Sequence, residues 1–169
     1  SKLIFWHLGN VHHEIASAGL VESGDVLSAE VVIRQTEFRP YFDPVSEYSR
    51  MLSELTEDKE RNLLIAADVA EAHRTCAGVC LVLSDRKKHC DTLRGLLRFK
   101  FDVDASLLTG DLNDESRRRV MDDVDKGRVR VLVATGQLVG EGFDCPHLST
   151  LFLATPIRFS GRVIQYLGR

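Results

Sequence analysis

Three almost continuous apolar runs of strand length constrain the fold of this chain more than any other feature. They are "VCLVL", "VRVLV" and "LFLA", which lie within residues 78–84, 129–135 and 148–155, and Arg130 is the one charged residue in them. A strand with one face in water alternates apolar and polar side chains, whereas a continuous apolar run is typical of a strand buried on both faces. Such strands need helices on both sides, so the runs predict the sheet of a layered α/β domain.

Helical patterns alternate with these runs along the chain. We expect helices at residues 45–55, 58–74, 85–99, 113–127 and 161–168, and further strands at residues 30–38 and 103–110. In the third of these helices Cys90, Leu93 and Leu97 share one face, as in a helix packed on a core. Strand and helix in turn predict a mainly parallel sheet flanked by helices.

The length of 169 residues and the hydrophobic share of 44% suit one domain with a sizeable core. Pro40 and Pro44 interrupt regular structure, so we expect residues 1–44 to be a connecting segment and residues 45–169 to be the domain. The apolar start "LIFW" and the end at "QYLGR" are expected to be cuts inside a longer polypeptide.

Composition limits the classes of partner. A net charge of -3 gives the chain no general attraction to nucleic acid or to membranes, so such a role needs local features. The four cysteines form no C-x-x-C pair, and no apolar run approaches the roughly 18 residues of a membrane span, which favours a cytoplasmic protein with reduced thiols. His7, His12 and His13 have no cysteine pair to complete a metal site, so we expect no metal.

Hydroxyl and glycine residues follow the expected strands at their carboxyl ends. They are Ser84, Thr109 with Gly110, and Thr135. Ligands of parallel sheets bind at this edge, and hydroxyls and free backbone N–H groups suit phosphate. Each end also has a structural explanation, because Ser84 and Asn113 can cap the helices that follow them. Three such ends on one edge favour contact with a nucleic-acid backbone.

The stretch "VRVLVATGQLVGEGFDCP" has the most specific pattern. Its glycines, Gly142 among them, let the backbone approach a ligand, and Asp144 can accept hydrogen bonds from ribose hydroxyls. A dinucleotide fingerprint fits poorly because Pro146 interrupts the helix it should begin, while a purely structural glycine loop stays open. The chain has no G-x-x-x-x-G-K-[ST] loop, so we do not expect it to form an ATP site by itself.

From about Gly78 onward the chain resembles the second RecA-like domain of superfamily 2 helicases, most closely bacterial DNA motors related to type III restriction and excision-repair helicases. "GVCLVLSDRKKHCDTL" is similar to motif IV, "LLTGDL" to the contact after it, "VLVATGQLVGEGFDCP" to motif V, and "QYLGR" to the first part of motif VI, Q-x-x-G-R-x-x-R. The pair Gly136-Gln137 departs from the pattern, since many relatives have an aspartate directly after the threonine of motif V. The resemblance implies a RecA-like three-layer sandwich.

The resemblance also implies a function and a set of site residues. Such a domain completes the site of ATP and Mg²⁺ held mainly by a first motor domain. Gly142 and Asp144 would contact ribose or phosphate. Gln165 and Arg169 would be the catalytic residues and would contact the γ-phosphate, with Arg169 as the arginine finger. Ser84, Thr109, Gly110 and Thr135 would contact the nucleic-acid backbone, with DNA favoured over RNA.

Two other functions stay open from the sequence. One is a nucleic-acid-binding module with a helicase-like fold and no catalysis. The other is an unrelated α/β domain that binds a small nucleotide without a second domain.

Overall fold

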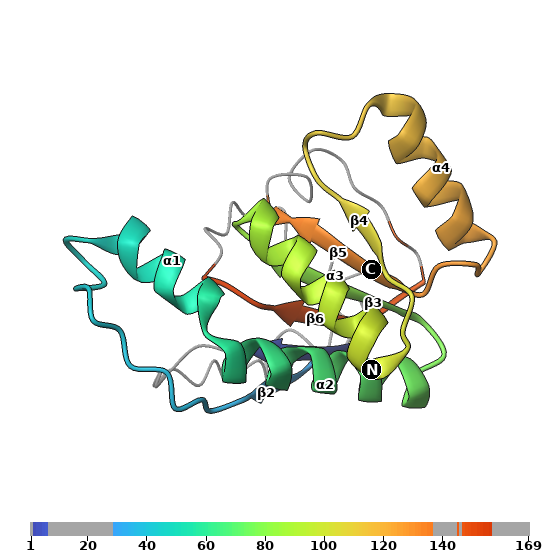
Figure 1. Ribbon diagram of the computed structural model, residues 1–169. Helices are drawn as coiled ribbons and strands as arrows, with labels where there is room; N and C mark the ends of the chain where they lie inside the picture. Colours follow the sequence, from blue (N-terminus) through green and yellow to red (C-terminus); the bar gives the residue numbers. More distant parts are fainter. Residues whose placement is uncertain (1, 7–28, 137–144, 146, 157–169) are drawn as a thin grey trace, which may run out of the picture.

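The computed structural model describes residues 2–6, 29–136, 145 and 147–156, and within them the chain forms helices packed on one sheet (Figure 1). The elements are β1 Lys2–Trp6, β2 Ala29–Ile33, α1 Tyr48–Glu57, α2 Lys59–Thr75, β3 Val79–Ser84, α3 Lys87–Phe101, β4 Ser106–Leu108, α4 Asp114–Asp125, β5 Val131–Thr135 and β6 Leu148–Leu153. The helix expected at residues 161–168 lies outside the described residues.

The six strands pair in the order β2-β1-β6-β3-β5-β4, and every pairing is parallel. The predicted parallel sheet is therefore confirmed. The three apolar runs form β3, β5 and β6 at its centre, and β3 and β5 are buried along their whole length. Two strands, β1 and β2, come from residues 1–44, which were expected to be a connecting segment. They extend the sheet beyond β6.

Alternating side chains of the central strands pack into two cores, one on each face of the sheet. Leu81 and Leu83 of β3 join Val124 of α4 on one face, while Cys80 and Val82 join residues of α2 and α3 on the other. The chain moves across the sheet in one direction from β3 to β4 and back from β4 to β5. Because such crossovers are right-handed, α3 and α4 must lie on opposite faces. Figure 1 shows the resulting three layers.

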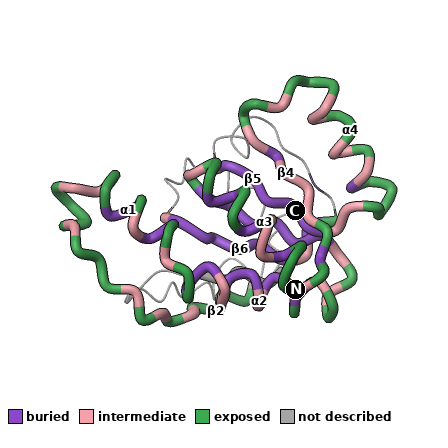
Figure 2. Tube along the Cα trace, in the orientation of Figure 1, coloured by how far each residue is buried: buried purple, intermediate pink, exposed green. Residues whose placement is uncertain are grey.

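Helix α1 extends beyond the carboxyl ends of β5 and β6 and carries a small core of its own (Figures 1 and 2). Its buried residues Met51, Leu52 and Leu55 pack against Phe38 and Phe42 of the preceding segment. The Tyr48 hydroxyl lies 3.5 Å from the backbone oxygen of Pro156, just after β6. Helix α1 is thereby held next to the edge of the sheet where the strands end.

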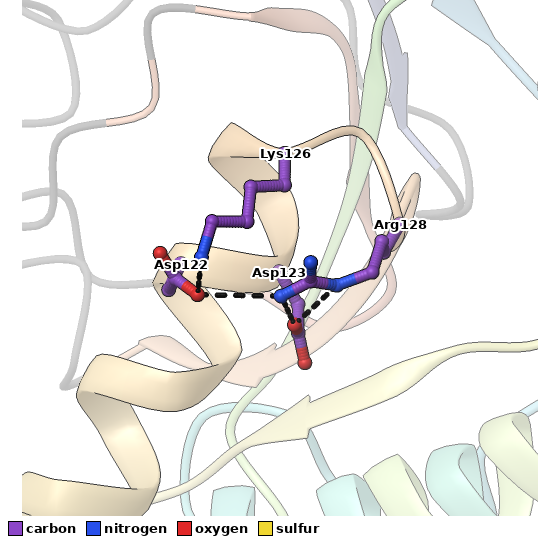
Figure 3. A network of polar contacts seen from close by, with 4 residues as sticks. All are labelled: Asp122, Asp123, Lys126 and Arg128. Atoms are coloured by element: carbon purple, nitrogen blue, oxygen red, sulfur yellow. Dashed lines mark hydrogen bonds and ion pairs between the residues drawn. The ribbon is translucent and has the colours of Figure 1, made fainter.

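The carboxyl end of α4 is fixed by a network of four charged side chains (Figure 3). Lys126 donates to Asp122, and Arg128 donates from Nε to Asp123 at 2.8 Å and from Nη2 to Asp122 at 3.3 Å. Gly127 has a φ of 70°, a left-handed conformation that favours glycine, and it turns the chain toward β5. These aspartates therefore pair with cations after the helix.

Among the described residues, no helix is both long enough and apolar enough to cross a membrane. Cys80, Cys90 and Cys145 are buried with free thiols, and Cys76 is free and half-buried. Burial raises the pKa of Cys80 to about 11 and that of Cys90 to about 12, so both stay protonated thiols inside the core.

Candidate nucleic-acid interface

The strand register brings three of the predicted backbone contacts to one edge of the sheet. Ser84 pairs directly with Thr135, and Leu108 pairs with Ala134, so Thr109 follows at the level of Thr135. Gly110 comes next along the chain. The sequence predicted this grouping from the rule that parallel strands end together, and the structure places all four residues there.

These four residues differ in how far they reach the surface. Gly110 is exposed, Thr109 is half-buried, and Thr135 has only 9% of its surface exposed. Thr109 also closes a turn, since its backbone oxygen accepts a hydrogen bond from the N–H of Leu112. The N-cap that follows is Asn113, whose side chain accepts from the N–H of Ser116 at 2.8 Å, as one of the structural explanations predicted.

Ser84 is directed inward, away from the surface of this edge. It is fully buried, and its hydroxyl lies 2.9 Å from Nδ1 of His89 and accepts a hydrogen bond from the N–H of Arg86. In this conformation Ser84 offers no exposed atom to a phosphate. Its hydroxyl instead binds the backbone at the turn between β3 and α3.

A buried polar chain continues from Ser84 through His89 to α2. His89 Nε2 lies 2.8 Å from Oδ1 of Asn62, and Nδ2 of Asn62 donates to the backbone oxygen of Thr56 at 2.8 Å. Because the Asn62 oxygen can only accept, Nε2 of His89 carries the proton and Nδ1 accepts from the Ser84 hydroxyl. All of these polar groups are satisfied when the imidazole is neutral.

Electrostatics keeps His89 in that neutral form. Burial is the main cause that lowers the pKa of His89 to about 3, and the positive charge of Arg61 lowers it further. Arg61 is itself 1% exposed, and burial lowers its pKa to about 10. Its guanidinium donates to the backbone oxygen of Ala154, directly after β6, so α2 is fastened to the same edge of the sheet.

Backbone and side-chain bonds also join the loops of this edge to one another. The N–H of Asp85 donates to the hydroxyl of Thr155 at 2.8 Å, linking the ends of β3 and β6. Arg86 donates to the hydroxyl of Ser49 in α1 at 3.0 Å, and Lys87 pairs with Asp111 after β4. These bonds connect the loops of the edge, and both of its cations have partners there, Arg86 in α1 and Lys87 at Asp111.

Four predicted site residues, Gly142, Asp144, Gln165 and Arg169, lie outside the described residues. Their contacts with nucleotide stay predictions. Thr135 and Gly136 mark where β5 leads into the glycine-rich stretch, at the same edge as Thr109 and Ser84. Among the described residues, no three His, Cys, Asp or Glu side chains come together as metal ligands.

Sequence reasoning missed the residues that hold the edge together. His89 lies five residues after Ser84, in the first turn of the helix that follows the strand. At this spacing the two side chains can come into contact, so the sequence held a local signal for this hydrogen bond. Asn62 and Arg61 reach the site from α2, and no sequence spacing indicates their contacts with His89 and Ala154.

The conserved sequence pattern of the helicase conserved C-terminal domain matches residues 59–169 of this chain. The chain belongs to this helicase family. The match begins with α2 and includes β3, β5 and β6, so it covers the central layers of the fold. No curated protein matches the chain.

Solved helicase structures share the fold of this helicase C-terminal domain. UvsW of T4 is 15% identical with a TM-score of 0.62, over 99% of this chain and 28% of UvsW. The helicase domain of Pyrococcus furiosus Hef is 21% identical with a TM-score of 0.52, over 72% of this chain and 26% of that one. S. cerevisiae Dbp5 bound to RNA and ADP BeF3 is 18% identical with a TM-score of 0.53, over 99% of this chain and 49% of the Dbp5 chain.

At these identities the likeness establishes the fold, and the predicted RecA-like three-layer sandwich is confirmed. The helicase C-terminal domain described here spans between 26% and 49% of the length of these three solved chains.

Proposed function

We propose that this chain is the second motor domain of an ATP-dependent helicase or translocase that moves along nucleic acid. The observation that carries the proposal is the family match across residues 59–169. In this fold the strands end together at one edge of the sheet, whose loops are hydrogen-bonded to one another. Helicases of this family use ATP, and their two motor domains close on the nucleotide between them.

The strand edge would contact the phosphates of one nucleic-acid strand. Gly110 is exposed and Thr109 is half-buried, and Lys87 would exchange its partner Asp111 for a phosphate. Arg86, which donates to Ser49 of α1, would add a second cation. Ser84 would act through the backbone at the start of α3, since its hydroxyl accepts from the N–H of Arg86. Contacts of this kind address phosphates rather than base edges, so binding would tolerate any sequence and weaken as salt rises.

Whether the nucleic acid is DNA or RNA is a separate part of the proposal. The sequence resemblance favours DNA, whereas the solved Dbp5 complex contains RNA. Phosphate contacts do not distinguish the two, because discrimination requires a contact with the 2′-hydroxyl. We propose DNA as the substrate, and a direct comparison of matched DNA and RNA oligonucleotides tests that choice.

ATP and Mg²⁺ would be held mainly by a first motor domain, with this chain closing the site. The donors at the described strand ends are hydroxyls, backbone N–H groups and cations, and this set suits phosphate oxygens rather than a metal ion. Gly142 and Asp144 would contact ribose or phosphate, and Gln165 and Arg169 would contact the γ-phosphate. An arginine in that position neutralises charge on the transferred phosphoryl group, an effect of about 10³ to 10⁵ in rate in related enzymes.

The test is to place this chain after a first motor domain that carries a G-x-x-x-x-G-K-[ST] loop and to measure ATP turnover with and without single-stranded oligonucleotide. We expect turnover that requires both domains and rises with the oligonucleotide. Oligonucleotide binding without any ATP turnover would favour a binding module that has the fold alone. Turnover by the isolated chain would favour an α/β domain with its own nucleotide site.

A further inference from the structure

A groove of about 440 Å³ lies between α2 and α3, separate from the exposed strand-edge residues. Both helices start near the carboxyl ends of the strands and run side by side away from them (Figure 1). The groove is lined along its length by Leu63 and Leu96, which are half-buried, and three lysines, Lys59, Lys88 and Lys100, stand around it. Its size is in the range of cavities that hold a ligand or a side chain of a partner.

The charge of this groove is positive. Glu57 is the one acidic residue among those that line it, and it lies 3.3 Å from the ammonium group of Lys88. Lys59 and Lys100 have no carboxylate partner within the part of the chain that the structure describes. The helix dipoles add to this charge at the end of the groove near Lys59 and Lys88, because α2 and α3 both begin there.

An unpartnered apolar surface extends the groove along α3. Leu96 and Phe99 are three residues apart and therefore neighbours on the helix surface. The Phe99 side chain is 91% exposed, so its ring is available for apolar contact with a partner. The polar groups behind the groove are already satisfied, since Asn62 and His89 bond to each other. What the groove offers a partner is therefore apolar contact surrounded by ammonium groups.

We propose that this groove binds an acidic peptide segment of a partner protein, anchored by an apolar side chain. The anchor would lie against Leu63, Leu96 and Phe99, and the carboxylates would pair with Lys59 and Lys100. The apolar floor decides against a nucleic-acid strand, whose phosphates would meet leucine side chains in place of hydrogen-bond donors. This proposal rests on the groove's own residues, so it does not depend on the motor function proposed above.

The experiment uses the 169-residue chain and two pools of displayed short random peptides. One pool is rich in Asp, Glu, Leu and Phe, and the other is rich in Lys, Arg, Leu and Phe. We expect a binder from the acidic pool alone, with its affinity measured by fluorescence anisotropy. Replacing both Lys59 and Lys100 by alanine should weaken that peptide about tenfold, given about threefold for each exposed ion pair. Lys126→Ala, which removes a lysine directly after α4 on the other face of the sheet, is the matched control and should leave the affinity unchanged.

Two further variants separate the two parts of the groove. Phe99→Ala changes an exposed side chain, so folding should be retained while affinity falls about fivefold through lost apolar contact. Glu57→Gln removes the competing carboxylate and should raise affinity for the acidic peptide. Thermal unfolding of each variant shows that it is folded.

Three outcomes would overturn the proposal. The first is that the acidic pool yields no binder, or none better than the basic pool. The second is that the selected peptide binds the double alanine variant as tightly as it binds the parent chain. The third is that the double variant loses affinity for a single-stranded oligonucleotide while no acidic peptide binds, because the groove would then serve nucleic acid.

Discussion

The buried imidazole of His89 should make the stability of this domain fall between about pH 7 and about pH 5. In the folded chain the pKa of His89 is lowered to about 3 by burial and by Arg61, against an ordinary value of 6.5. Between these two values the unfolded chain binds a proton that the folded chain does not. Stability therefore rises with pH across this window and is lost as the pH falls through it.

The size of the effect follows from the pKa difference. Each unit is worth about 1.4 kcal/mol, and at about pH 5 the unfolded histidine is protonated while the folded one is not, which gives a loss of about 2 kcal/mol relative to about pH 7. The carboxylates with lowered pKa, Asp43 and Asp122, have ordinary values of 3.8 and add little above about pH 5. The pKa of His73 is also lowered, through burial first and Arg130 second, so it contributes in the same direction.

The assay is urea unfolding of the chain at the two pH values, for the parent and for His89→Gln. Glutamine can still donate to Asn62 and accept from Ser84 but does not titrate, so most of the pH-dependent loss should disappear. His73→Gln is the matched control and should keep most of it. A His89→Gln chain that loses as much stability as the parent between the two pH values would refute the claim that a neutral His89 holds this edge.

Further predictions follow from glycines and from charges at the strand edge. Gly95→Ala should raise the free energy of unfolding by about 0.5 to 1 kcal/mol, since Gly95 lies within α3 and an added Cβ meets nothing within 4 Å. Gly78→Ala should lower it by about 1 to 3 kcal/mol, because the Cβ would lie 2.6 Å from the backbone oxygen of His147; equal melting temperatures for the two variants would contradict both. Oligonucleotide binding to the chain should weaken as salt rises, and Arg86→Ala should weaken it about equally for all base sequences; a loss confined to one sequence would argue against phosphate contact. The isolated chain should hydrolyse no ATP above background, and turnover abolished by Asp144→Ala would show that it forms its own site.

The central layers of the fold could be predicted from sequence because their signals are local. The runs at β3, β5 and β6 are mostly apolar, and the helices between them have a clear apolar face. Their bounds shift by a few residues, since α3 is Lys87–Phe101 where residues 85–99 were expected, and β4 is only Ser106–Leu108. Strand β1 could not be predicted, because a short apolar start gains its strand structure from pairing with β2 and β6.

The site could be predicted only as far as the strand ends. The rule for parallel sheets places Ser84, Thr109 and Thr135 together, and the register confirms that grouping. The rule could not show that Ser84 is directed inward, because its orientation depends on His89 and Asn62. Asn62 is 22 residues before Ser84 in the chain and is brought to His89 by the packing of α2.

The most direct test of the motor function is ATP turnover by a polypeptide in which this chain follows a first motor domain, with Arg169 intact or replaced. If Arg169 reaches the γ-phosphate, Arg169→Ala should lower turnover by about 10³-fold or more while melting temperature and oligonucleotide binding stay nearly unchanged. Arg169→Lys should restore little, because lysine lacks the planar fork that binds two phosphate oxygens. Turnover close to that of the parent, with a slightly lower melting temperature, would instead assign Arg169 a structural role and contradict the proposed function.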